Sequence, residues 1–244
     1  MFDYLANPAR FVRFARIIGP YVNVLTLGVL AVGIYWSLFI APADYQQGET
    51  VRIMFIHVPA AWMGTFCYAY IALASAVSLI FKHPLADVAA KSAAPIGAAF
   101  TFLALITGSL WGKPMWGAWW VWDARLTSML VLFLLYLGYM ALWQMIEEPV
   151  QAGRVAAILG LVGAVNVPII KYSVDWWNTL HQPASIMKGG GPSIHPSILT
   201  PLLIMIGAYM LIFTALILLG MRGEILRRKV RNMRLAQAEG GAHG

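Results

Sequence analysis

Six stretches of the chain carry apolar side chains almost without interruption, and polar or charged residues gather between them. Each stretch has roughly the 20 residues that a helix needs to cross a bilayer. The pattern therefore predicts an all-α integral membrane protein with six transmembrane helices. The predicted spans are residues 21–41, 58–81, 93–111, 126–143, 154–171 and 198–220.

The composition supports a membrane protein. Of the 244 residues, 60% are hydrophobic and only 11% are charged, whereas roughly a quarter of an average globular domain is charged. A soluble protein of this length could not cover its surface with so few charges. We expect one membrane domain over residues 1–244, ending in a basic tail at residues 221–244.

The distribution of lysine and arginine predicts the orientation. Counted by loop, twelve lie on one side of the predicted membrane and five on the other. The first group is Arg10, Arg13, Arg16, Lys82, Lys91, Arg154, Arg222, Arg227, Arg228, Lys229, Arg231 and Arg234, and the second is Arg52, Lys113, Arg125, Lys171 and Lys188. Positive charge collects on the cytoplasmic side of membrane proteins. Both termini are therefore predicted to be cytoplasmic, and loops 42–57, 112–125 and 172–197 to face outward.

The formal net charge of +7 could suggest a nucleic-acid partner. Much of the excess, however, lies in the segment 222–234 just after the last span. A basic segment in that position is typical of a topology signal or of a contact with anionic lipid. We therefore expect membrane lipid, and no nucleic acid, as a partner.

Tryptophan is distributed unevenly between the two predicted faces. Nine tryptophans fall at or near the outer face, and only Trp143 lies at the inner one. The nine are Trp36, Trp62, Trp111, Trp116, Trp119, Trp120, Trp122, Trp176 and Trp177. Interfacial aromatic belts normally occur at both surfaces, which indicates that the outer face does more than anchor the chain.

The segment WGAWWVWDARLT, residues 116–127, holds four of these tryptophans. As a surface helix it would place Trp116, Trp119 and Trp120 on one face, and as an extended segment Trp120 and Trp122. Either arrangement gives an aromatic surface suited to a large, flat, apolar ligand, whose anionic groups Arg125 could bind. The alternative is that the tryptophans are interface anchors and that Asp123 caps the fourth helix.

Two histidines flank this segment on the same predicted side. His57 stands where the first outer loop enters the second span, and His181 stands in the third outer loop. An iron macrocycle needs an apolar surface, partners for its propionates and one or two axial ligands, for which histidine is common. The pair could clamp such a ring from opposite faces. His195, in a Gly/Pro-rich outer loop, is a possible substitute ligand.

The predicted spans contain no Asp, Glu, Lys or Arg near their middle, which argues against an ion pump or a proton relay. The chain also has no phosphate-binding glycine loop, so we expect no nucleotide hydrolysis by the chain itself.

The pattern Trp-Gly-x-x-Trp-x-Trp-Asp, here Trp116, Gly117, Trp120, Trp122 and Asp123, resembles the signature of the tryptophan-rich (WWD) family of haem-handling proteins. The segments ARLTS, IHVPAAW and WWNTLHQP narrow the resemblance to the family's members in cytochrome c maturation. It extends over essentially the whole chain, including six spans with both termini inside.

The resemblance implies that haem b binds transiently at the periplasmic face of the bacterial inner membrane, with His57 and His181 as axial iron ligands. The residues expected to contact it are Trp116, Gly117, Trp119, Trp120, Trp122, Asp123 and Arg125. Haem would then be presented to the periplasmic chaperone CcmE, with CcmD assisting and the ABC-type subunits CcmA and CcmB releasing the loaded chaperone.

The candidate residues include no nucleophile and no general acid. We therefore expect a protein that binds and presents haem, not an enzyme, although its placement of a haem vinyl group would assist attachment to the chaperone. Three alternatives stay open: a membrane b-type cytochrome for electron transfer, a transmembrane haem channel, and a structural subunit of a transporter.

Overall fold

The computed structural model describes residues 6–177, 179–181, 185–186 and 191–241. These residues form helices and no strand. The elements are α2 (Pro8–Tyr35), the π-helix η1 (Trp36–Ile40), the 3-10 helix η2 (Glu49–Ile53), α3 (Met54–Phe81), α4 (Ala86–Trp116), α5 (Ala124–Met145), α6 (Pro149–Gly163), α7 (Asn166–Trp176) and α8 (Pro196–Gly241).

Six segments of the described chain are long and apolar enough to cross a membrane, which confirms the predicted fold class. They are Pro8–Ile40, Glu49–Phe81, Ala86–Trp116, Ala124–Met145, Pro149–Trp176 and Pro196–Ala238. The cellular side on which each end of the bundle lies stays a prediction.

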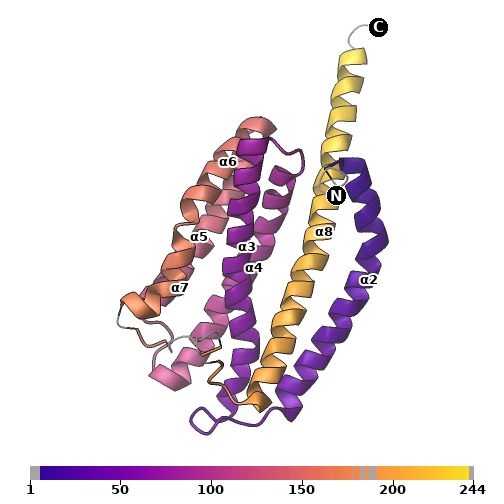
Figure 1. Cartoon of the computed structure of the whole chain (residues 1–244). Coiled ribbons are helices and arrows are strands. Elements are labelled where there is room, and N and C mark those ends of the chain that lie inside the picture. Colours follow the sequence, from indigo (N-terminus) through magenta and orange to yellow (C-terminus); the bar gives the residue numbers. More distant parts are fainter. Residues whose placement is uncertain (1–5, 178, 182–184, 187–190, 242–244) are drawn as a thin grey trace.

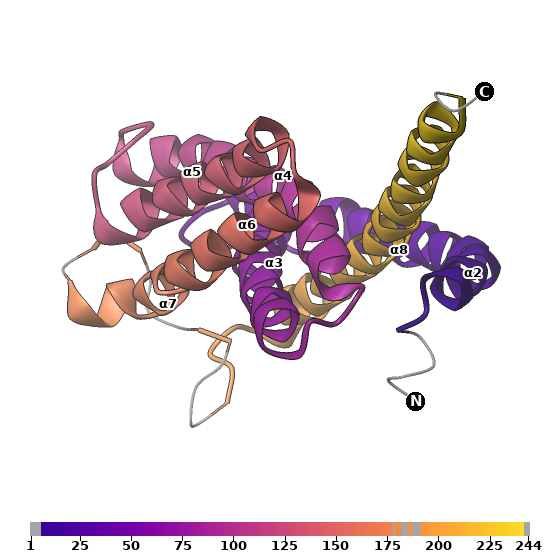
Figure 2. The same cartoon turned by 90° about the horizontal axis from the view of Figure 1, so that it is seen from above.

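Helices α3 to α7 form one group, and α2 and α8 form a pair beside it (Figure 1). Helix α2 packs along α8, and α8 in turn packs on α3 and α4, as the view from above shows (Figure 2). Helix α2 begins and α8 ends at the same end of the bundle, which we call the terminal end. At the other end, the tryptophan end, α4 stops and α5 starts.

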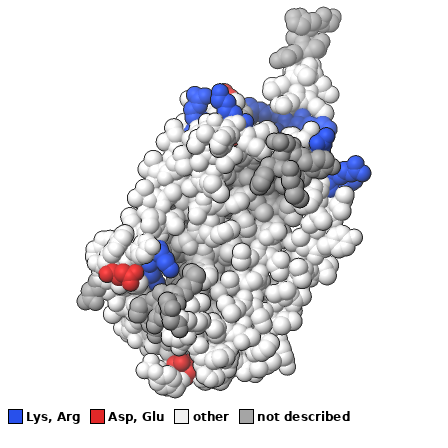
Figure 3. Space-filling view, in the orientation of Figure 1, with Lys and Arg blue, Asp and Glu red and all other residues white. Residues whose placement is uncertain are grey.

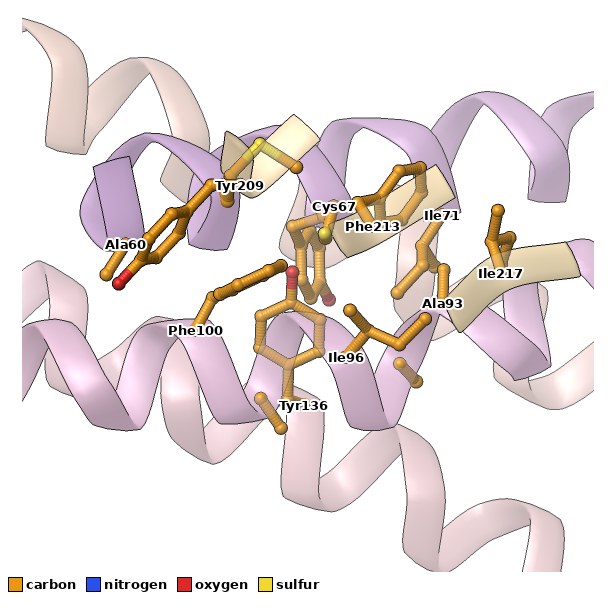
Figure 4. Packing of buried hydrophobic residues seen from close by; sticks show 14 of the residues in the cluster. Ala60, Cys67, Ile71, Ala93, Ile96, Phe100, Tyr136, Tyr209, Phe213 and Ile217 are labelled. Carbon is orange, nitrogen blue, oxygen red and sulfur yellow. The ribbon is translucent and has the colours of Figure 1, made fainter. Parts of the chain in front are cut away.

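The core lies where α3, α4, α5 and α8 meet (Figure 4). Small side chains of α4, among them Ala93, Gly97 and Thr101, let α3 and α5 approach closely. A Cβ on Gly64 of α3 would lie 2.6 Å from Oγ1 of Thr101. Close backbone approach at small residues is how membrane helices gain van der Waals contact without a hydrophobic driving force.

Buried polar groups in this core donate to main-chain carbonyls of other helices. The Tyr136 hydroxyl donates to Gly64 O at 2.7 Å, and Asn166 Nδ2 donates to Ser128 O at 2.9 Å. An unpaired polar group in the bilayer interior costs several kcal/mol. These hydrogen bonds therefore fix how α3, α5 and α7 sit against one another.

The predicted fifth span, residues 154–171, consists of two helices. Helix α6 ends at Gly163 and α7 starts at Asn166, with tight turns that pair Val165 N–H with Val162 O. Pro168 has no N–H to donate to the carbonyl four residues earlier, so a continuous helix would leave that carbonyl without its partner. The helical ends also extend past the predictions, to Pro8 in α2 and to Gly241 in α8. The predicted basic tail is thus largely a continuation of α8.

Candidate functional site

The tryptophan segment is not a surface helix. Helix α4 ends at Trp116, and Gly117, with φ of 76°, caps it by donating its N–H to Lys113 O. Residues 118–123 are irregular, and α5 starts at Ala124 with Asp123 as its N-cap. The helical alternative for residues 116–122 was therefore wrong, and the extended one is closer, because the rings of Trp120 and Trp122 do meet, at 5.4 Å and 78°.

Trp119 and Trp122 expose 56% and 74% of their surface. Trp116 instead packs inward: its ring lies over Gly112, where a Cβ would come within 3.0 Å of Cε3. The same ring meets the His181 imidazole edge-on, with centroids 4.9 Å apart. The segment therefore combines an exposed aromatic surface with one tryptophan that fixes a histidine.

His181 is held by Asp123, 58 residues earlier in the chain. Its Nδ1 lies 2.8 Å from Oδ2 of Asp123, which also accepts from the Thr179 hydroxyl at 2.7 Å. Thr179 Oγ1 accepts the His181 N–H at 3.0 Å. An ionised carboxylate only accepts hydrogen bonds, so Nδ1 carries the proton and Nε2 keeps its lone pair.

Asp123 has two functions at once. Its Oδ1 accepts the Leu126 N–H at 2.8 Å, which confirms the predicted cap of α5. Burial by itself raises the pKa of Asp123, but the hydrogen bonds from Leu126, Thr179 and His181 outweigh it and hold the pKa below its usual value. Burial also lowers the pKa of His181, against the opposing effect of Asp123. The pair is thus a carboxylate and a neutral imidazole near neutral pH.

His57 has the same arrangement on different elements. Helix α3 begins at Met54, so His57 belongs to its first turn instead of preceding the span. Its Nδ1 lies 3.1 Å from both Ala104 O and Thr107 Oγ1. The Thr107 hydroxyl donates to Leu103 O at 2.7 Å, so its oxygen is left as an acceptor. Nδ1 therefore carries the proton here too, and Nε2 keeps its lone pair.

Two residues of α4 fit around the His57 imidazole. Gly108 gives it room, since a Cβ there would lie 2.9 Å from Cε1. The Trp111 ring meets it edge-on at 5.6 Å, and Trp111 Nε1 donates to Gln47 Oε1 at 3.0 Å. His57 contacts Ala104, Thr107 and Trp111 of α4, and His181 contacts Trp116 at the end of the same helix. The structure thus brings together the two histidines that the sequence singled out.

His195 differs from both. Its Nδ1 accepts the N–H of Ser197 at 3.3 Å, and its carbonyl accepts from the first turn of α8. A backbone N–H can only donate, so the neutral ring carries its proton on Nε2. His195 is exposed and directly precedes Pro196, the first residue of α8; its role as a substitute ligand stays a prediction.

Three of the cations predicted for this face, Arg125, Lys113 and Arg52, donate to main-chain carbonyls. Arg125 donates to Ser173 Oγ at 3.2 Å and to the carbonyls of Ile170 and Lys171 near the end of α7. Lys113 Nζ donates to Gly117 O at 3.0 Å. Arg52 donates to Ser37 O and Leu38 O at 2.8 and 2.6 Å, at η1. Each of them fixes a segment next to the site, and the binding of a ligand's anionic groups by Arg125 stays a prediction.

Sequence reasoning missed the residues that support the histidines: Thr107, Gly108, Trp111 in its contact with His57, and Thr179. The one available signal was the spacing of Gly108 and Gly112 ahead of Trp116. Residues four apart share a helix face, and these two glycines leave room on α4 for two large rings.

The chain matches, over residues 1–236, the family model described as CcmC, Heme exporter protein C. A protein named Heme exporter protein C from Bradyrhizobium diazoefficiens is 60% identical over 234 residues, which are 96% of this chain and 89% of the relative. One of the same name from Escherichia coli K12 is 48% identical over 93% of this chain and 91% of its own. A putative ccmC-like mitochondrial protein of cytochrome c biosynthesis from Marchantia polymorpha is 46% identical, covering 88% and 89%.

Proposed function

Since this chain belongs to the Heme exporter protein C family, we propose that it binds haem at the tryptophan end and delivers it during cytochrome c biogenesis. The observation that carries the proposal is the matched state of two histidines. In both His57 and His181 the Nδ1–H is held by an acceptor and Nε2 keeps its lone pair. This is how proteins prepare an imidazole to ligate a metal.

The surrounding residues fit haem as a cargo. Trp119 and Trp122 offer exposed aromatic surface of the kind on which a macrocycle stacks. Trp120 Nε1 is buried and has no hydrogen-bond acceptor within the described residues. A propionate oxygen would supply that acceptor. Two axial imidazoles would leave no open position on the iron, which fits a carrier and not an oxygen-activating enzyme.

We further infer that the tryptophan end faces the periplasm and that both termini are cytoplasmic, because the terminal end carries most of the lysine and arginine (Figure 3). In a bacterial inner membrane, this orientation would let haem pass from His57 and His181 to the periplasmic chaperone CcmE. CcmD, CcmA and CcmB complete the proposed assembly. A b-type cytochrome is disfavoured, since both histidines lie at one end of the bundle and not between mid-span helices.

The proposal is tested on the full chain purified in detergent and reconstituted with haem. We expect sharp low-spin absorbance bands, and haem recovered with soluble CcmE after the two proteins are mixed and separated. A chain that binds no haem contradicts the proposal at its centre. Haem that is bound but cycles reversibly with a quinol, and is never passed to CcmE, would instead favour the cytochrome.

The variant Asp123→Asn tests the hydrogen bond to His181 while keeping the hydrogen bond that caps α5. Asparagine keeps an oxygen for the Leu126 N–H, but its NH₂ group would face the His181 Nδ1–H, so two donors oppose each other. We expect haem affinity to fall about 10- to 100-fold, as when a metal site loses an outer hydrogen-bond partner. Asp44→Asn is the matched control, because that carboxylate accepts only from Gln46 and Gln47 N–H groups among the contacts described. Equal haem affinity in the two variants would contradict the role given to Asp123.

Gly108→Ala tests the position of His57 without removing it. The new methyl group would lie 2.9 Å from Cε1 of His57, which must shift away from Ala104 O. We expect about tenfold or greater loss of haem affinity and a partial change to high-spin bands. Gly28→Ala, which adds a methyl group with nothing within 4 Å, is the control. An unchanged spectrum in Gly108→Ala would show that His57 does not ligate iron in this position.

A further inference from the structure

A polar cavity lies at the terminal end, far from the histidines. It has a volume of about 120 Å³ and is formed by α4, the end of α5, the start of α6 and α8. Four of its lining residues are cationic and two are acidic: Lys91, Arg227, Arg228 and Arg231, against Glu147 and Glu224. Figure 3 shows lysine and arginine gathered at this end of the molecule. The volume is several times the roughly 10–15 Å³ that a single water needs.

The Glu224 carboxylate accepts hydrogen bonds from three of these cations, and each cation keeps further N–H donors that Glu224 does not bind. It is buried, with 7% of its surface exposed, and accepts from Lys91 at 2.8 Å, Arg227 at 2.9 Å and Arg228 at 3.1 Å. Arg228 also pairs with Asp87 at 2.8 Å. Among the described residues, Arg231 donates to the carbonyl of Glu147 alone, at 3.5 Å. The lining therefore holds four cations and two carboxylates, with Asp87 as a third carboxylate beside Arg228.

Two buried donors in this wall make no hydrogen bond of good geometry, although the Tyr139 hydroxyl lies near one of them, Trp143 Nε1. They are Trp143 Nε1 and Arg228 Nη2, each shielded from solvent and without a hydrogen bond in the part of the chain described. The Lys91 ammonium lies 4.6 Å from the centroid of the same Trp143 ring. Native proteins rarely leave buried donors unpaired unless a ligand, ion or water completes them. These two donors and the excess of positive charge in the lining favour an oxyanion as the ligand of the cavity.

The position of the cavity relative to the membrane indicates which kind of molecule carries the oxyanion. Trp143 stands two residues before the end of the span Ala124–Met145, at the edge of the apolar zone. Tryptophan side chains gather at the headgroup level, and basic pockets between membrane helices bind anionic headgroups. The N-terminal N–H groups of α6 are not counted as anion donors, because the Glu148 carboxylate already accepts from the N–H groups of Val150 and Gln151.

We propose that this cavity binds the phosphate group of an anionic phospholipid headgroup. Phosphate oxygens accept from Trp143 Nε1 and Arg228 Nη2, and Lys91 and Arg231 balance the charge. A bound headgroup would join α4, α5 and α8 at the end of the bundle opposite the histidines. This role is independent of haem binding.

The full-length chain purified in detergent is exchanged into nanodiscs of phosphatidylcholine alone or with added phosphatidylglycerol, and lipid retained on the protein is counted by native mass spectrometry. Trp143→Phe removes the N–H and keeps a ring, and Arg231→Gln removes a cation that makes one weak contact within the part of the chain described. Lys229→Gln is the matched control, since it lies exposed in the same helix turn and does not line the cavity.

We expect wild type and Lys229→Gln to retain phosphatidylglycerol, and each cavity variant to bind it about tenfold more weakly, the loss expected when a hydrogen bond to a charged group disappears. Gel filtration shows that the variants remain folded. Inorganic phosphate is titrated in parallel: binding that follows the same order of variants supports the phosphate site with a free anion as its source. Equal retention by all four chains, or no phosphate bound in either form, overturns the proposal.

Discussion

Replacing either His57 or His181 by alanine is expected to abolish low-spin haem binding by this chain. Each imidazole is oriented by its own acceptor, Ala104 O for His57 and Asp123 for His181, and in the proposed site each would supply one axial ligand. Loss of an outer partner at a metal site already costs 10- to 100-fold, and we expect loss of a ligand to cost about 100-fold or more. The measurement is the absorbance spectrum of purified protein titrated with haem.

His195→Ala is the control for both variants. It removes a histidine from the same end of the bundle, but one whose Nδ1 accepts from Ser197. We expect it to keep the wild-type spectrum. If His195→Ala lost the low-spin bands while His57→Ala kept them, the assignment of ligands from the hydrogen bonds at Nδ1 would be wrong.

Gly97→Ala should strongly destabilise the bundle without touching the histidines. A Cβ at residue 97 would lie 2.2 Å from the hydroxyl of Tyr136 and 2.3 Å from its Cζ. Tyr136 is fully buried, and its hydroxyl donates to Gly64 O, so the ring has no free space to enter. Overpacking of about 1–3 kcal/mol and a lost hydrogen bond of about 1 kcal/mol would lower the free energy of unfolding by about 3 kcal/mol. The free energy of unfolding of this variant and of wild type is measured by equilibrium unfolding in mixed detergent micelles.

Gly207→Ala makes the same change in α8, where nothing lies within 4 Å of the new methyl group. Alanine favours a helix interior over glycine by up to about 1 kcal/mol, so this variant should unfold no more easily than wild type. Similar stability of Gly97→Ala and Gly207→Ala would mean that Tyr136 moves easily, and that the contact of α3, α4 and α5 is looser than described.

The sequence predicted the spans well because each is a long apolar run whose burial in lipid depends little on its neighbours. It predicted less well where local packing determines the residue at which a helix starts, ends or breaks. The break between α6 and α7 lies just before Asn166 and Pro168 in a stretch that is otherwise apolar, and α3 starts at Met54, directly after η2. Hydropathy alone does not distinguish such a break from a continuous helix.

At the candidate site, residue types indicated the two histidines and the tryptophans, but not the contacts that prepare them. Asp123 and His181 are 58 residues apart, and His57 meets Thr107 across 50 residues. Only the fold brings such pairs together. For Arg125, the charge suggested a ligand contact, which stays a prediction, but residue type did not indicate that its guanidinium donates to the end of α7.

The length of α8 determines how far from the membrane surface a protein bound to its C-terminal end would lie. Its 46 residues span about 69 Å at 1.5 Å each, while the apolar bilayer is about 30 Å thick. Even a tilt of about 40° uses only some 39 Å of helix. Because α8 starts at the tryptophan end and projects past the bundle at the other (Figure 1), about 30 Å of helix extends beyond the apolar layer. A protein bound to its last turns would therefore be held well away from the membrane surface, while one bound to the α3–α4 connection would rest on it.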